Sequence, residues 1–183
     1  QLLKKYPGID SLAFCFFLIY LAAQAVQGNW SFFTMDQFKW SESMVGISLA
    51  VVGILVGLVQ AGLTRVINPR LGNEKSVYTG LLLYTLGLVL FAFASEGWMM
   101  FLFLVPYCLG GIAGPALQSI LATHVPPNEQ GALQGTLTSL MSLTTIIGPL
   151  IMNNLFTYFS SPKAPFYFPG IFFLLAALFM LCS

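Results

Sequence analysis

Charged side chains are scarce in this chain of 183 residues. Lys, Arg, Asp and Glu together make up 7% of it, whereas 57% of the residues are hydrophobic. Soluble domains usually carry roughly 25% charged residues, so the composition excludes a soluble enzyme and a disordered segment. The net charge of +1 provides no basic surface and excludes nucleic acid as a partner. The sequence therefore predicts a protein that lives in the lipid bilayer.

Residues that build catalytic or metal sites are also few. The single histidine, His124, has no second ligand at a suitable spacing. The three cysteines, Cys15, Cys108 and Cys182, lie far apart within apolar runs and are interpreted as packing residues. We find no nucleophile motif, phosphate loop or zinc signature. The prediction is a protein that is not an enzyme and that has no catalytic residues, no metal and no cofactor.

The apolar residues fall in runs of about twenty, the length of a helix that crosses roughly 30 Å of hydrocarbon. The runs do not alternate in polarity, and lipid otherwise permits only closed barrels, so helices are expected. We predict an all-α integral membrane protein whose six transmembrane helices form one domain over residues 1–183. The expected spans are about 9–33, 44–67, 76–95, 98–123, 131–159 and 164–182.

The basic residues fall unevenly between the two sides of this predicted bundle. Under the positive-inside rule, the richer side is cytoplasmic, so both ends of the segment are expected there. The richer side holds Lys4, Lys5, Arg65, Arg70 and Lys75, and the other side holds Lys39 and Lys163. The seven basic and six acidic residues all fall in loops or near helix ends. Proton relays generally use charged groups inside the membrane, so any proton carrier is predicted to lie outside this chain.

Amide side chains replace charges inside the spans. They are interpreted either as hydrogen-bonding partners between helices or as groups that contact a solute. The candidates for a substrate pathway are Gln24, Gln27, Gln60 and Gln118.

Glycine and proline interrupt several spans. Gly53 and Gly57 form a small-xxx-small pattern, typical of close helix packing. Proline lacks a backbone N–H donor, and glycine lacks a side chain, so each can interrupt a helix. Such interruptions predict either a static kink or a helix that moves and lines a cavity. These candidates for bending or gating are Pro106, Gly114, Pro115, Gly148 and Pro149.

A series of short motifs resembles a known family. In order, they are Val45-Gly46-Ile47-Ser48-Leu49-Ala50, Gly53-Ile54-Leu55, Gln60-Ala61, Arg70-Leu71-Gly72-Asn73-Glu74-Lys75, Ser95-Glu96-Gly97-Trp98, Pro115-Ala116-Leu117-Gln118, Gln130-Gly131-Ala132-Leu133-Gln134-Gly135 and Ile147-Gly148-Pro149-Leu150. From roughly Phe14 to Tyr158, the chain closely resembles the C-terminal half of the tetracycline-efflux branch of the major facilitator superfamily.

The resemblance implies spans seven to twelve of a twelve-helix carrier in a bacterial inner membrane, which exchanges a drug for protons. Its partners would be the bilayer, an N-terminal six-helix half, a small hydrophobic drug-like solute and protons. The first, second, fourth and fifth spans would line the cavity, and the third and sixth would support them. A cytoplasmic gating loop would comprise Arg65, Arg70, Gly72, Glu74 and Lys75, although its basic residues equally suit topology anchors.

The chain also departs from the family. Tetracycline carriers typically have a histidine and an aspartate where this chain has Val56 and Tyr84, and Asn68-Pro69 lies where the gating motif has an acid. These differences weaken the expectation that the solute is tetracycline or a metal chelate. Gln24 and Gln60, by contrast, match amides found at those places in the family.

Two other functions account for the same composition. A six-span scaffold or sensor needs no charge inside the membrane, and a six-span facilitator working as a homodimer needs no coupling ion. The chain starts at Gln1 without Met and stops at Ser183 within an apolar run. Those ends favour a segment of a longer carrier.

Overall fold

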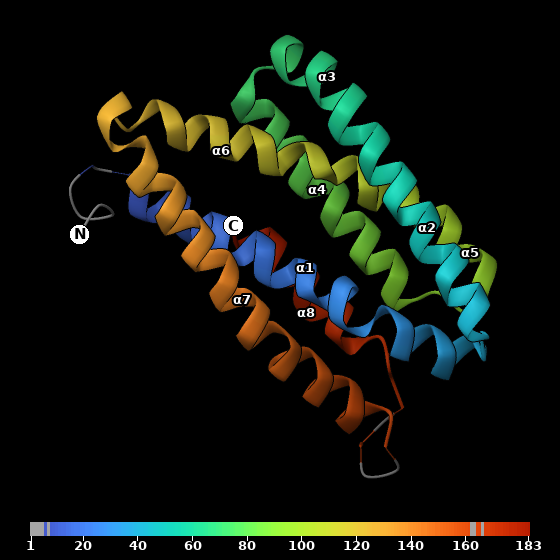
Figure 1. The fold of residues 1–183 in the computed structure, drawn as a ribbon. Coiled ribbons are helices and arrows are strands. Elements are labelled where there is room, and N and C mark those ends of the chain that lie inside the picture. Colours follow the sequence, from blue (N-terminus) through green and yellow to red (C-terminus); the bar gives the residue numbers. More distant parts are fainter. Residues whose placement is uncertain (1–5, 7, 162–163, 166) are drawn as a thin grey trace.

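The computed structural model describes residues 6, 8–161, 164–165 and 167–183 (Figure 1). Every regular element in this described part is helical, so the predicted all-helical membrane fold is confirmed. The elements are α1 (Ile9–Phe38), α2 (Glu42–Leu58), the π-helix η2 (Val59–Leu63), α3 (Thr64–Leu71), α4 (Asn73–Ala92), α5 (Gly97–Leu109), the 3₁₀-helix η3 (Gly110–Ile112), α6 (Ala113–Thr123), the 3₁₀-helix η4 (Pro127–Glu129), α7 (Gln130–Phe159) and α8 (Ile171–Cys182).

Within the part of the chain that the structure describes, five helical stretches are long and apolar enough to cross a bilayer, and α8, with 12 residues, is shorter. The second stretch joins α2, η2 and α3, and the fourth joins α5, η3 and α6. The last helix begins at Ile171, later than the expected start at Ala164. Pro165 and Pro169 explain this difference, because proline disfavours helix in the residue before it. Lys4, Lys5 and Lys163, used in the predicted topology, lie outside the described residues.

Local backbone chemistry sets the first helix boundaries. The first helix continues past the predicted Phe33 to Phe38 and ends where Lys39 adopts a left-handed conformation, with φ of 55°. Ser41 then caps α2, because its Oγ accepts a hydrogen bond from the Met44 amide at 3.3 Å. Gly72 separates α3 from α4 with φ of 81°, a value that glycine adopts without strain. The chain therefore turns at Gly72, one of the residues of the expected gating loop.

Aromatic side chains hold the centre of the bundle together. Trp30 of α1 lies edge-on to Phe91 of α4, with ring centroids 5.3 Å apart. Phe33 of α1 lies edge-on to Phe173 of α8, at 5.1 Å. The indole Nε1 of Trp30 also donates a hydrogen bond of 2.8 Å to the Ser48 Oγ of α2. Because all four aromatic side chains are buried, these contacts join α1, α4 and α8 around one core.

Two long stretches leave much of their surface uncovered. In the most apolar window of α1, 61% of the residues are buried, against 17% for Glu42–Leu71 and 22% for Pro127–Phe159. In Figure 1 these two stretches run along opposite edges of the bundle. A Cβ added to Gly53 or Gly57 meets nothing within 4 Å. The predicted small-residue face of α2 therefore has no partner helix within the described chain.

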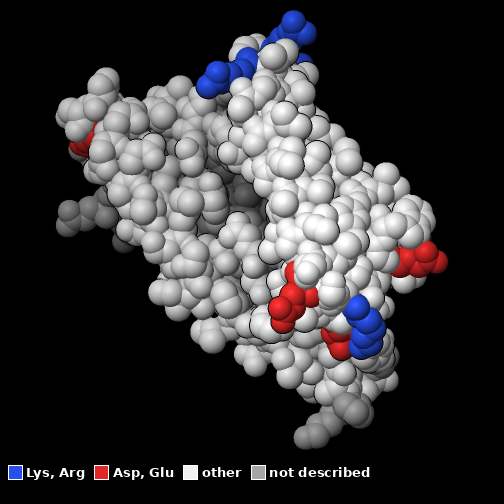
Figure 2. Space-filling view, turned by 45° about the vertical axis from the view of Figure 1, so that its right-hand side comes forward, with Lys and Arg blue, Asp and Glu red and all other residues white. Residues whose placement is uncertain are grey.

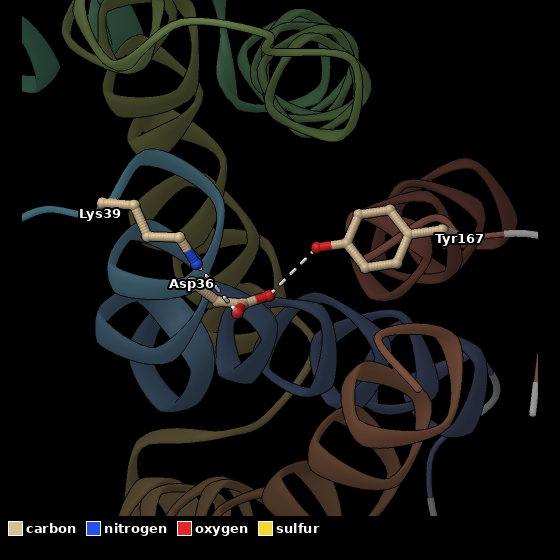
Figure 3. A network of polar contacts seen from close by, with 3 residues as sticks. All are labelled: Asp36, Lys39 and Tyr167. Atoms are coloured by element: carbon tan, nitrogen blue, oxygen red, sulfur yellow. Dashed lines mark hydrogen bonds and ion pairs between the residues drawn. The ribbon is translucent and has the colours of Figure 1, made fainter. Parts of the chain in front are cut away.

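Charged side chains lie at the two ends of the bundle, and none of those that the structure describes is buried. Figure 2 shows basic residues gathered at one end and a mixed group at the other. In the mixed group, the Tyr167 hydroxyl donates a 3.3 Å hydrogen bond to Asp36 Oδ2, and Lys39 Nζ lies 3.7 Å from Asp36 Oδ1 (Figure 3). This network ties the segment before α8 to the end of α1.

Candidate functional site

A cavity of about 400 Å³ lies among α1, α2, η2, α4 and the interrupted helix α5–η3–α6. Figure 2 shows the surface hollowed beside the part of the chain that carries α2. Among the described residues, none of those that line the cavity is charged. Its polar side chains are three amides, three phenols and one thiol, from Gln27, Gln60, Gln118, Tyr20, Tyr84, Tyr107 and Cys108.

Helix α1 contributes one face to this cavity. Tyr20, Ala23 and Gln27 line it, at the spacing that puts side chains on one side of a helix. Gln24 lies on another side, is only 7% exposed and packs against Gly148 of α7. Gln24 and Gln27 therefore have different surroundings: Gln27 lines the cavity, and Gln24 contacts α7. Side chains three residues apart on a helix point in directions that differ by roughly 60°, which is enough for one to face the cavity and the other the neighbouring helix.

The second span contributes Val52, Val56 and Gln60, again on one helical face. Gln60 belongs to the π-helix η2, which the sequence did not reveal. Thr64 Oγ1 donates a 2.9 Å hydrogen bond to the carbonyl of Val59 across this wider turn. π-helical turns occur frequently at functional sites, and this one contacts η3 of the fourth span. Both irregular turns therefore lie at the cavity wall.

Gly110 and Gly111, in the 3₁₀ turn η3 of the fourth span, leave room for the side chain of Tyr84 from α4. A Cβ on Gly110 would lie 2.6 Å from Tyr84 Cγ, and one on Gly111 would lie 3.7 Å from the Tyr84 hydroxyl. The Tyr84 ring therefore passes over two residues without side chains and reaches the cavity. This differs from the supporting role that the family resemblance implied for the third span, and none of the lining residues comes from α7.

The predicted bend residues fall into two groups. Pro106, Gly114 and Pro115 flank η3, and Gly114 and Pro115 line the cavity. A Cβ on Gly114 would be 4.0 Å from the Tyr20 hydroxyl, an ordinary contact. Gly148 and Pro149 instead lie within α7, which stays helical through both of them. The cavity thus includes Gly114 and Pro115 of the first group and neither residue of the second.

The predicted gating residues surround the junction between α3 and α4. Arg65, Arg70, Glu74 and Lys75 are all exposed there, around the turn at Gly72. Next to this turn, Asn73 Nδ2 donates a 2.9 Å hydrogen bond to Ser119 Oγ, which links the start of α4 to α6.

Glu74 and His124 also line a separate, larger cavity of about 570 Å³ among α1, α4, α6 and α8. That cavity contains none of the four predicted pathway amides. The Nδ1 atom of His124 lies 2.9 Å from the Ile120 carbonyl oxygen, so the ring already has a partner on its own helix. We therefore place the candidate site in the smaller cavity, where the amides gather.

Tyr20 and Tyr107 also line the cavity, although the pattern of amides in the sequence does not indicate them. A signal for Tyr20 is present in the sequence, because it lies two helical turns before Gln27 on the same face. No comparable pattern points to Tyr107, which is buried and reaches the cavity wall through the packing of α5 against α4.

These features define a helical membrane protein with an uncharged, amide-lined cavity beside an uncovered helix. Residues 12–183 match the family model of the Major Facilitator Superfamily. The chain belongs to this superfamily of membrane transporters.

The chain is 42% identical to the class C tetracycline resistance protein of Escherichia coli over 148 residues, which are 81% of the chain and 37% of that relative. It is 42% identical to the class G protein of Vibrio anguillarum over 143 residues, covering 78% and 36%. The mouse hippocampus abundant transcript 1 protein is 28% identical over 159 residues, covering 85% and 32%. The matched part of the chain therefore spans about a third of the length of each of these relatives.

Proposed function

We propose that this chain is the C-terminal half of a twelve-helix antiporter that exports a small hydrophobic drug-like solute in exchange for protons. The observation that carries the proposal is the uncharged cavity, which lies beside the uncovered helix α2. Secondary transporters hold their substrates near the midplane, between two repeats. The cavity is then one wall of a site that the other half completes.

The chemistry of the uncovered faces supports a protein partner. Helix α7 exposes Ser139, Ser142 and Thr145, whose hydroxyls donate hydrogen bonds of 2.7–3.0 Å to carbonyls of their own helix. On α2, Gly53 and Gly57 leave open space. Small and hydroxyl residues are enriched where membrane helices meet, so both faces suit contact with the N-terminal six-helix half.

Proton coupling is assigned to that other half. Among the residues described, no charged side chain is buried, and proton relays in membranes generally need one. The solute pathway in this half is assigned to Gln27, Gln60 and Gln118, whereas Gln24 supports the α1–α7 contact. The N-terminal half would then carry the protons, and this half would contribute the amide-lined part of the solute pathway.

The orientation follows from the exposed basic residues near α3. Arg65, Arg70 and Lys75 lie at one end of the bundle and would face the cytoplasm of a bacterial inner membrane. Exposed charges at a tight turn suit either a gating latch or a topology anchor. Neutralising Arg70 separates the two roles, because loss of a latch slows transport while loss of an anchor changes the accessibility of the loop.

Everted membrane vesicles containing the full-length protein test the proposal. Energising the vesicles should drive uptake of a hydrophobic drug, and a protonophore should abolish it. Gln60→Ala and Gln118→Ala should lower uptake at an unchanged protein level, whereas Thr79→Ala, on an exposed part of α4, should not. Absence of proton-driven uptake across a drug panel would favour the scaffold or sensor. Flux from the 183-residue protein alone in proteoliposomes would favour the homodimeric facilitator.

A further inference from the structure

We infer that this cavity wall selects an uncharged, flat aromatic solute over an organic cation or a metal chelate. Its assignment to a transported substrate rests on the proposed function, but the recognition itself is a binding property. Two observations carry the inference: the described residues of the wall carry no charge, and two tyrosine rings in it are held by their neighbours.

The absence of charge disfavours a cationic ligand. No Asp or Glu lines the cavity, and the described residues contain no cluster of three or more His, Cys, Asp or Glu that could hold a metal ion. Val56 and Tyr84 fill this wall with an alkyl group and a phenol. A cation entering here would lose water without gaining a counter-charge from this half, and such desolvation is costly.

Two rings on this wall are held in place before a ligand arrives. Tyr20 packs against Phe16, with ring centroids 4.5 Å apart and an angle of 40° between the rings. Tyr84 packs edge-on to Tyr107 at 5.1 Å, and it lies over Gly110 where no side chain could fit. Rings that are already ordered lose little freedom on binding, so they favour flat, rigid ligands.

The amides complete the recognition. Gln60 and Gln118 each carry donors and acceptors in the cavity, which suit carbonyl and hydroxyl groups at the rim of an aromatic solute. The volume of about 400 Å³ lies within the usual range of small-molecule sites. Tyrosine faces do attract cations, but that attraction is weaker than the cost of burying an unpaired charge.

Equilibrium dialysis against the purified full-length carrier tests this recognition without requiring transport. The probes are N-phenyl-1-naphthylamine, which is uncharged and aromatic, ethidium, which is a permanent cation, and tetracycline with Mg²⁺. We expect the uncharged probe to bind at least about tenfold more tightly than either of the others, with no effect of EDTA.

Substitutions of the two fixed tyrosines test whether their rings are responsible for the selectivity. Tyr84→Phe keeps the ring and should bind the uncharged probe within about twofold of the natural protein, whereas Tyr84→Leu should lose about fivefold. Tyr84→Asp should shift the preference toward ethidium. Tyr78→Leu, an exposed position on α4, is the matched control and should change nothing. If Tyr84→Leu does not fold, Tyr20→Leu replaces it, with the same expected loss.

Tighter binding of ethidium or of the Mg²⁺ complex by the natural protein would overturn the inference. So would equal binding by Tyr84→Phe and a folded Tyr84→Leu or Tyr20→Leu variant. Selective binding without proton-driven uptake would contradict only the proposed function. Proton-driven uptake with a preference for the cation would contradict only the selectivity inferred here.

Discussion

The side chain of Gln24 in α1 lies directly against Gly148 in α7, so closely that a Cβ on the glycine would overlap the Gln24 Cβ and Cγ. Gln24 is 7% exposed and belongs to the contact between these helices rather than to the cavity. Gly148, expected as a bending residue, therefore sets how closely α1 and α7 approach. The pair explains why a glycine lies within a helix that stays regular.

Gly148→Ala should destabilise the full-length carrier. Forcing an extra methyl into a packed contact typically costs about 1–3 kcal/mol. Gly28→Ala is the matched control at the same helix pair, because a Cβ there would meet only Pro149 Cγ at 4.0 Å. Thermal unfolding in detergent should show a lower midpoint for the first variant and an unchanged or higher midpoint for the second. Equal thermal midpoints for Gly148→Ala and Gly28→Ala would mean that α1 and α7 can move apart to accommodate the added methyl group, which would contradict the tight contact at Gly148.

Asn29→Leu should stabilise the protein. Asn29 is fully buried, and neither its Oδ1 nor its Nδ2 has a hydrogen-bond partner in the described part of the chain. A buried polar group without a partner costs about 1–3 kcal/mol, which a leucine of similar size avoids. The thermal midpoint should rise, and it should stay unchanged for Asn154→Leu, because Asn154 is exposed. A fall in the Asn29→Leu midpoint would indicate that the amide has a partner in another conformation of the carrier.

The network of Asp36, Lys39 and Tyr167 should respond to alkaline pH. Burial, the negative charge of Asp36 and the hydrogen bond to its carboxylate raise the pKa of Tyr167 above its usual value. The contact is therefore fully present below the unfolded pKa of tyrosine, about 10, and is lost as the pH rises through the higher folded pKa.

Tyrosinate absorbance measures this titration, and the difference between the natural protein and Tyr167→Phe isolates the Tyr167 signal. Asp36→Asn removes the negative charge, so it should lower the pKa of Tyr167 toward the usual value. Lys39 lies near Oδ1 of Asp36, the carboxylate oxygen that Tyr167 does not contact. Lys39→Gln is the comparison variant, because it changes a charge in the network but keeps the carboxylate that contacts Tyr167. A Tyr167 midpoint that Asp36→Asn leaves in place would contradict the contact in Figure 3.

The sequence was sufficient for features that depend on residues close together in the chain. The apolar runs predicted the long helices, and the placement of charges predicted that none is buried in the described part. The gating loop that the family resemblance implied contains a turn at Gly72, whose positive φ suits glycine. These features need only composition and local backbone preference, which a sequence contains directly. The predicted start of the last span, Ala164, was too early, because it followed the apolar character of the segment and gave too little weight to the helix-breaking effect of Pro165 and Pro169.

The candidate site depended on how helices cross, and the sequence was less informative there. Gln27, Gln60 and Gln118 do come together, but Gln24 does not join them. Tyr84 reaches the cavity only because Gly110 and Gly111 of another helix lack side chains. The contact of Tyr84 with these glycines joins residues that are distant in the chain, so the pattern of residues along a single helix does not predict it.

Gly53→Leu should impair transport without disturbing the bundle described here. A Cβ at Gly53 meets nothing within 4 Å, so the larger side chain has room within this half. If α2 packs against the N-terminal half, the same side chain overpacks that contact and costs about 1–3 kcal/mol, enough to slow a conformational exchange by about tenfold. Thr79→Leu, on an exposed part of α4, is the control for added bulk. Drug uptake by vesicles should fall for Gly53→Leu alone, at equal protein levels. Normal uptake by both variants would place the N-terminal half elsewhere and leave the face of α2 to lipid.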